Sequence, residues 1–199
     1  MIAVLQRVNR AEVFANGEFS GKCEKGLLIL LGVMDTDDAQ DAILLADKIS
    51  KMRIFSDNNG KMNLSVTDVG GGALIVSNFT LGADYLHGNR PNYLMSAKPD
   101  KAIPLYEMFI SLMRERIFEV QSGVFGADMQ IRCECDGPVT IIVDSANLVH
   151  KGKGSPNGKY IKCNNKENEN DNTKCSVSKC TVAQETTDGN RRSVRGENT

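Results

Sequence analysis

GLLILLGVMDTDDAQDAILLADKIS, residues 26–50, joins a candidate buried strand to a candidate surface helix. Residues 27–33 form a short, wholly apolar run, which is typical of a buried strand, although periodicity alone does not exclude a helix. Residues 35–38 then supply N-cap candidates and negative charge at a helix start. Apolar side chains recur at helical spacing beyond them, which predicts an amphipathic helix over residues 37–53.

Further strands and one more helix are predicted on either side of this unit. The predicted strands are residues 2–8, 11–15, 18–23, 27–33, 73–79, 117–121, 129–135 and 139–144. Asn16-Gly17 is a strong hairpin signal between the second and third of these. A second helix is predicted to begin near Asp100, with Pro104 near its first turn, because deeper in the helix a proline would remove a backbone hydrogen bond. This order of elements predicts a compact α+β domain, with two helices on one side of a largely antiparallel or mixed sheet.

The bulk composition is ordinary for a soluble globular protein, with 41% hydrophobic and 25% charged residues. The net charge of −1 gives no sign of a strong non-specific RNA binder, although it leaves a local basic patch open. The first residues lack the pattern of a signal peptide, and no apolar run approaches the roughly 20 residues of a transmembrane helix. We therefore expect a cytoplasmic protein with no membrane partner.

The composition changes near residue 150, which predicts a folded domain at residues 1–147 and a polar tail at residues 148–199. Residues 1–150 carry 14 Lys and Arg against 19 Asp and Glu, whereas residues 151–199 carry 10 against 6. Few sizeable apolar side chains occur in the tail, so we expect it to be disordered. It is either an idle extension or a basic arm that helps to hold RNA.

The six cysteines are expected to be reduced and unpaired, because the chain is long and shows no secretory signal. Cys133 and Cys135 are two residues apart, so their side chains share a face if both lie on one strand. No second tight Cys or His pair accompanies them, as zinc sites usually require. The sequence predicts neither a metal site nor a cofactor.

Two polar segments are candidates for chemistry. Ser77-Asn78-Phe79-Thr80-Leu81 lies at the end of a predicted buried strand, where its hydroxyls, amide and backbone N–H groups could hold a carbonyl and its developing oxyanion. The alternative is a strand end with ordinary local hydrogen bonds. Gly137-Pro138 precedes a strand and is either a simple turn or a cis peptide bond.

No Ser/His/Asp or Cys/His set can be assembled from the sequence. His87 and His150 both lie in polar surroundings. If the domain hydrolyses an ester, we therefore expect it to do so without a strong side-chain base.

Several motifs in the same order resemble the D-aminoacyl-tRNA deacylase family. They are LQRV around Arg7, then GLLILLGV, ADKISKMRIF, GKMNLS, SNFTL, FGADMQ and DGPVT, and they span residues 1–145. The resemblance implies an α+β homodimer that hydrolyses the ester between a D-amino acid, or glycine, and the 3′ end of tRNA. The activity implied is chiral proofreading by an enzyme that needs no cofactor.

The resemblance also implies roles for particular residues. Ser77, Asn78, Phe79, Thr80 and Leu81 would line the pocket, with backbone N–H groups near Asn78 and Phe79 stabilising the oxyanion. Thr80 is a candidate nucleophile or water-orienting hydroxyl, and the 2′-hydroxyl of the tRNA is the alternative that we favour. Gly137 and Pro138, joined by a cis bond, would enter the pocket of the partner subunit. Their carbonyls would leave no room for an L side chain.

Two positions depart from the family pattern. Asn78 stands where the family usually has Gln, and Cys135 stands where it usually has Asn. A shorter amide or a lost hydrogen bond beside the pocket would weaken catalysis. The alternative function is therefore a dimeric module that binds tRNA ends with little or no turnover.

Overall fold

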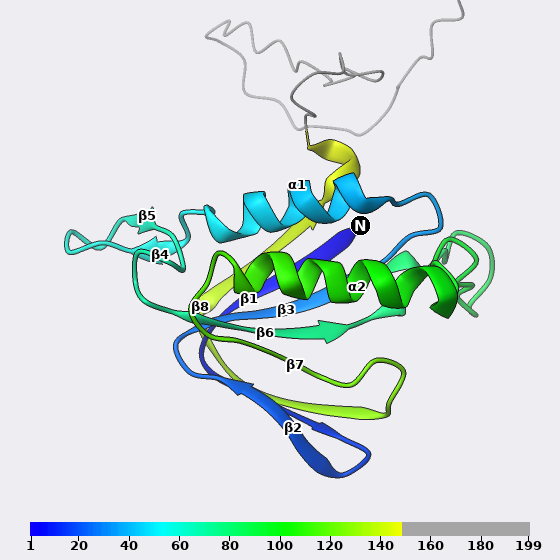
Figure 1. The fold of residues 1–199 in the computed structure, drawn as a ribbon, viewed down its shortest axis with the longest axis horizontal. Helices are drawn as coiled ribbons and strands as arrows, with labels where there is room; N and C mark the ends of the chain where they lie inside the picture. The colour runs from blue at the N-terminus through cyan, green and yellow to red at the C-terminus, as the bar shows by residue number, and fades with distance from the viewer. Residues whose placement is uncertain (149–199) are drawn as a thin grey trace, which may run out of the picture. The chain divides into compact units, whose positions relative to one another are not determined.

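A computed structural model of the protein describes residues 1–148. The predicted polar tail, apart from Leu148, lies outside the described residues. The predicted α+β class is confirmed, because a mixed sheet carries two helices over one of its faces (Figure 1).

The main sheet has the strand order β2-β1-β3-β6-β7, and β8 pairs with β1 as well. Its strands are β1 (Ile2–Ala15), β2 (Glu18–Cys23), β3 (Gly26–Gly32), β6 (Gly72–Ser77), β7 (Val120–Ser122) and β8 (Met129–Asp144). The pairs β3–β6 and β6–β7 are parallel, and the others are antiparallel. The short strands β4 (Phe55–Ser56) and β5 (Met62–Leu64) form a separate hairpin.

The helices α1 (Ala39–Ser50) and α2 (Pro99–Arg114) lie side by side on the sheet and enclose the main core (Figure 1). Each is amphipathic, and its apolar stripe supplies fully buried side chains such as Leu45 and Phe109. From the sheet, Leu5, Ile29 and Ile75 meet them at 0% exposure. Neither helix combines the length and hydropathy that a bilayer-spanning helix needs.

The start of α1 is fixed by three aspartates, Asp37, Asp38 and Asp41. Asp38 is the N-cap, and its carboxylate accepts hydrogen bonds from the N–H groups of Gln40 and Asp41 at 2.8 and 3.3 Å. The Asp41 carboxylate accepts the Asp38 N–H in return, which completes a capping box. Asp37 turns inward instead, and its carboxylate lies 2.6 Å from the α-ammonium group of Met1. The acidic run therefore both starts the helix and ties it to β1.

Pro104 lies one turn further into its helix than the first turn, near which the sequence placed it. Helix α2 begins at Pro99, so Pro104 lies in its second turn rather than its first. The carbonyl that loses its hydrogen bond is that of Asp100, four residues earlier. Both residues are exposed, so water can serve that carbonyl and the helix continues.

Strands β1 and β8 are each continuous where the sequence predicted two strands. In β1 the register against β8 shifts between Val8 and Arg10, which makes Asn9 an extra residue. In β8 the register jumps from Cys135, opposite Val8, to Thr140, opposite Gln6. The intervening residues 136–139 leave the ladder as an excursion, which contains Gly137 and Pro138.

The sheet curls so that β2 approaches β7 from the other side. The Lys22 N–H donates to Gln121 Oε1 at 2.9 Å, and a Cβ at Gly21 would lie 3.0 Å from the Ser122 carbonyl oxygen. A second, smaller core fills the inside of this curl. Its members are Val8, Ala11, Val13, Cys23, Leu28, Leu74 and Val76.

Candidate active site

A pocket of about 210 Å³ opens where β6 ends. Strand β6 stops at Ser77, and the short 3-10 turn η1 (Phe79–Gly82) follows it. The pocket combines residues from β3, β6, α2 and the segment before β8. Its lining is Leu31, Val33, Ser77, Asn78, Phe79, Ala97, Ala102, Tyr106, Phe125, Gly126, Ala127 and Met129.

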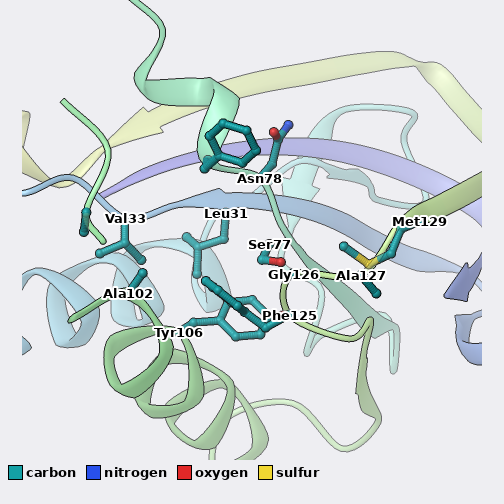
Figure 2. A pocket seen from close by; sticks show the side chains of 12 residues that line it. Leu31, Val33, Ser77, Asn78, Ala102, Tyr106, Phe125, Gly126, Ala127 and Met129 are labelled. Carbon is teal, nitrogen blue, oxygen red and sulfur yellow. The ribbon is translucent and has the colours of Figure 1, made fainter. Parts of the chain in front are cut away.

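Two aromatic rings lie at one end of this pocket and an amide at the other. Figure 2 shows Tyr106 beside Phe125, Asn78 at the opposite end, and Ser77 between them. The two ring centroids are 5.6 Å apart. The Tyr106 hydroxyl donates to the Ile75 carbonyl at 3.0 Å, and burial raises the pKa of Tyr106 above its ordinary value. Tyr106 therefore stays protonated and acts as a wall of the pocket.

No side chain that lines the pocket is an effective base at neutral pH. Its polar side chains are those of Ser77, Asn78 and Tyr106, and the remaining lining residues are apolar or glycine. Any ester hydrolysis here must therefore depend on fixed hydrogen-bond donors and on groups that the substrate brings. The described residues also contain no cluster of three or more His, Cys, Asp and Glu side chains that could hold a metal ion.

The backbone at η1 presents one unengaged donor. The Asn78 N–H donates to the Leu31 carbonyl at 2.8 Å, and the Thr80 N–H donates to Asn78 Oδ1 at 3.2 Å. The N–H of Phe79, between them, has no acceptor within residues 1–148. Of the two N–H groups expected near the oxyanion, that of Phe79 is thus the one available to a ligand.

The Thr80 hydroxyl is held by Asn78 and not by a base. Its Oγ1 donates to Asn78 Oδ1 at 2.5 Å, and an amide oxygen cannot take the proton away. Thr80 is exposed and does not line the pocket. Leu81 is also outside the lining. It lies against Gly32, because a Cβ added at Gly32 would be 3.0 Å from the Cβ of Leu81.

The peptide bond Gly137-Pro138 is cis, as predicted. Both residues are exposed on the excursion from β8. Its base is held by Arg7, which is 8% exposed. The guanidinium Nε lies 2.8 Å from Asp136 Oδ2 as an ion pair, and another guanidinium nitrogen donates to the Ile54 carbonyl at 2.6 Å.

Within one chain, Gly137 and Pro138 do not reach the pocket. Arg7, which contacts their excursion, is opposite Leu27 on β3, whereas Ser77 is opposite Leu31. Four residues along a strand correspond to about 13 Å. The structure therefore brings together Ser77, Asn78 and Phe79, places Thr80 and Leu81 just beyond them, and leaves Gly137 and Pro138 apart.

Comparison with known proteins identifies the family. A family model described as D-Tyr-tRNA(Tyr) deacylase matches residues 4–144, which include the pocket and the excursion. The chain belongs to this deacylase family.

Similar proteins carry matching names. A D-aminoacyl-tRNA deacylase of Chloroflexus aurantiacus is 53% identical over 148 residues, which cover 74% of this chain and 92% of that one. Its counterpart from Anaeromyxobacter dehalogenans is also 53% identical and is covered to 99%.

Two solved structures are similar in fold to this chain. A structure titled c-Myc DNA Unwinding Element Binding Protein has a TM-score of 0.69 at 36% identity, covering 72% of this chain and 98% of that one. The second is a structure of a probable eukaryotic D-amino acid tRNA deacylase, with a TM-score of 0.62 at 17% identity. The match covers 71% of this chain and 97% of that one, and at this identity it shows similarity of fold alone.

Of the twelve residues that line the pocket, the sequence singled out three, Ser77, Asn78 and Phe79. Ala102 and Tyr106 belong to the second predicted helix, in which apolar side chains are expected to face the core and not a pocket. Phe125 and Met129 lie in the FGADMQ motif, which supported the family resemblance but was given no functional role. A signal existed in that motif, since Phe125 is a large aromatic residue in the loop just before a strand, and such a side chain has no core to fill unless the loop folds over a pocket.

Proposed function

We propose that this protein hydrolyses the ester bond of D-aminoacyl-tRNA and releases free tRNA and the D-amino acid. The observation that carries the proposal is the pocket at Ser77, Asn78 and Phe79, which lies inside the segment that matches the deacylase family. Relatives that are 53% identical over nearly their whole length are named D-aminoacyl-tRNA deacylases. Removal of D-amino acids from tRNA is chiral proofreading, and we infer a cytoplasmic protein.

The unengaged Phe79 N–H is the proposed oxyanion donor. An ester carbonyl oxygen placed near it gains negative charge as the attacking oxygen adds, and the fixed N–H stabilises that charge. Because the Thr80 hydroxyl donates a hydrogen bond to Asn78 Oδ1 and no base contacts it, we propose that Thr80 is not the nucleophile. The 2′-hydroxyl of the terminal ribose is then the group that assists attack by water. Ser77, with its hydroxyl in the pocket, and Leu81 complete the proposed substrate surroundings.

We further propose a homodimer in which Gly137 and Pro138 enter the pocket of the partner subunit. The excursion is exposed and lies too far from the pocket of its own chain. Backbone carbonyls in that position would exclude an L side chain without reading the identity of a D side chain. The smaller substrate glycyl-tRNA has no side chain to exclude, so we propose that it is also hydrolysed.

The domain boundary near residue 147 is part of the same proposal. The family match ends at residue 144, and the Anaeromyxobacter dehalogenans relative aligns with 148 residues of this chain, which is 99% of its own length. Residues 148–199 would then be an addition to the catalytic unit, with no part in the chemistry.

One observation favours a second function, a module that binds tRNA ends without efficient turnover. The oxygen of the Asn78 amide, at one end of the pocket, is already occupied by the N–H and hydroxyl of Thr80, and Cys135 precedes the excursion. Either change could leave a binding surface whose chemistry is weak.

The deciding experiment is single-turnover deacylation by the purified full chain. D-aminoacyl-tRNA and glycyl-tRNA are the test substrates, and the matching L-aminoacyl-tRNA is the control. We expect rapid release of the D-amino acid and no acceleration with the L substrate. Tight binding of both without release would instead establish the tRNA-end binding module.

A further inference from the structure

Cys133 and Cys135 form a pair of neighbouring thiols on β8 that the proposed reaction does not use. Their sulfur atoms are 3.7 Å apart, and both residues are exposed. Cys23, the remaining cysteine of the described residues, is buried in the smaller core. Within residues 1–148, oxidants in solution therefore reach Cys133 and Cys135 first.

The pair lies where β8 leaves its ladder with β1. Cys133 and Cys135 are opposite Ala11 and Val8, and the next paired residue of β8 is Thr140. Cys135 is bonded directly to Asp136, whose carboxylate is held by Arg7. A change in the backbone at Cys135 is consequently passed to the base of the Gly137-Pro138 excursion.

Only a small movement separates these thiols from a covalent link. Residues i and i+2 of a strand have Cα atoms about 6.6 Å apart, whereas disulfides most often span about 5.5–6 Å. The strand must therefore shorten locally by up to about 1 Å. The extra residue Asn9 already makes the β1–β8 ladder irregular here, and no strand of the described residues pairs with the other edge of β8.

We propose that Cys133 and Cys135 are a redox modification site, at which hydrogen peroxide converts the two thiols into an intramolecular disulfide. In the first step the Cys135 sulfur attacks the peroxide, an S–O bond forms, the O–O bond breaks and water leaves. The Cys133 sulfur then attacks Cys135, an S–S bond forms, and a second water carries away the oxygen and the remaining proton. Two thiols lose two electrons, and one hydrogen peroxide is reduced to two waters.

The order of attack follows from the environment of Cys133. Loss of hydration at the strand surface, together with its hydrogen bond to Cys135, raises the pKa of Cys133 above its ordinary value. Either sulfur can be the donor in that hydrogen bond, and the Cys133 thiol holds its proton more tightly than an ordinary thiol. A thiol that stays protonated is a poor first nucleophile, so it acts as the resolving group.

The disulfide draws the backbone at Cys135 toward Cys133 and displaces Asp136 from its position beside Arg7. Because Gly137 and Pro138 follow directly, oxidation should misplace the excursion. A misplacement near 1 Å can lower a rate by about a hundredfold. This effect on deacylation rests on the proposed function, whereas formation of the disulfide does not.

The test treats the full chain with hydrogen peroxide in the presence of a chelator, then blocks free thiols with an alkylating reagent and digests with trypsin. Cleavage after Arg132 gives a peptide that begins at Cys133 and contains both residues. We expect this peptide to lose two hydrogens and to escape alkylation, and we expect a dithiol reductant to reverse both changes. Cys133→Ser and Cys135→Ser should each prevent the loss, whereas Cys163→Ser, Cys175→Ser and Cys180→Ser together should not.

Persistent alkylation of both residues, oxygen addition to one of them, or cross-links to other cysteines would overturn the modification site. On D-aminoacyl-tRNA, oxidation should slow wild-type deacylation by about tenfold or more, with recovery on reduction and no effect in Cys133→Ser. An unchanged rate in the oxidised protein would overturn the coupling to the excursion. A protein that is inactive before oxidation would contradict the proposed function, while the peptide mass still decides the modification site.

Discussion

At the scale of single residues, Gly137 has the most demanding backbone. Its φ is +125°, and an added Cβ would lie 2.8 Å from the backbone nitrogen of Val139. Gly137→Ala should therefore shift the excursion, lower the free energy of unfolding by about 1–3 kcal/mol and slow deacylation by about tenfold or more. Chemical denaturation and single-turnover kinetics measure the two effects.

Gly60→Ala is the matched control for Gly137→Ala. Gly60 also has a positive φ, +75°, but nothing lies within 4 Å of its added Cβ, and it is remote from the pocket. This variant should lose stability without losing activity. Full activity in Gly137→Ala would contradict a role for the excursion in the site.

Thr80 permits a direct test of the nucleophile. Its hydroxyl donates to Asn78 and has no base beside it, so Thr80→Val should reduce the rate of D-aminoacyl-tRNA hydrolysis by less than about tenfold. Substrate ending in 2′-deoxyadenosine should react far more slowly with both forms. A loss of about a thousandfold or more in Thr80→Val, with deoxy substrate unaffected, would make Thr80 the nucleophile.

At the scale of elements, the cap of α1 offers a stability prediction that leaves the site alone. Asp38→Ala removes the acceptor for two N–H groups and should lower the free energy of unfolding by about 1 kcal/mol. Asp35→Ala, in the same acidic run, removes no side-chain hydrogen bond among the described residues and is the control. Equal losses in the two variants would show that the capping box contributes nothing beyond charge.

The elements that depend on local pattern were predictable from sequence. The apolar run at 27–33 became β3, and the helical stripe at 37–53 contains α1. In contrast, the sequence split β1 and β8 into two strands each, because polar Asn9 and the Gly137-Pro138 dipeptide interrupt the patterns. Both strands continue because each is the partner of the other, and such pairing across more than 100 residues leaves no local mark.

The candidate site also consists of a part that local sequence predicts and a part that only the fold brings together. Ser77, Asn78 and Phe79 end a strand, which a single segment reveals, and the structure brings them into one pocket. Ala102, Tyr106, Phe125 and Met129 come from elsewhere in the chain, and only folding places them opposite that strand end. The hydrogen bond of the Asn78 N–H to Leu31 could not be foreseen either, because it depends on the parallel register of β3 and β6.

At the scale of the whole molecule, the proposed dimer can be tested by complementation. Ala127→Leu should fill the pocket, and Gly137→Ala should displace the excursion, so neither variant alone should deacylate well. In a mixed dimer, one site pairs an intact pocket with an intact excursion. If subunits exchange freely, an equal mixture should recover about a quarter of wild-type activity. No recovery after refolding the two together would contradict a site shared between subunits.

The stability of the whole domain should depend on alkaline pH through Cys23. Burial raises the pKa of this thiol from 9.0 to about 11. The folded state therefore keeps a proton that the unfolded state releases, so stability is full below pH 9 and declines as the pH rises toward 11. At pH 10.5 the loss from this group is about 2 kcal/mol.

Cys23→Ala isolates that contribution. The variant should be less stable than wild type at pH 7.5, because a small cavity opens in the core, but its further loss between pH 7.5 and 10.5 should be smaller by about 2 kcal/mol. Urea denaturation at the two pH values gives the comparison. Parallel declines in both proteins would show that Cys23 does not titrate in this range.

The position of β1 between three partners governs the order of events during synthesis. Ile2 is opposite Gly32 on β3 but also opposite Asp144 at the end of β8, so the first strand of the domain to be made finds its longest partner last. Until β8 has been made, from residue 129 onward, one edge of β1 stays open to unrelated chains. The nascent protein is thus exposed to aggregation for almost the whole time that its domain is being made, and a chaperone that covers a strand edge should raise the yield of folded chain more than one that shields helices.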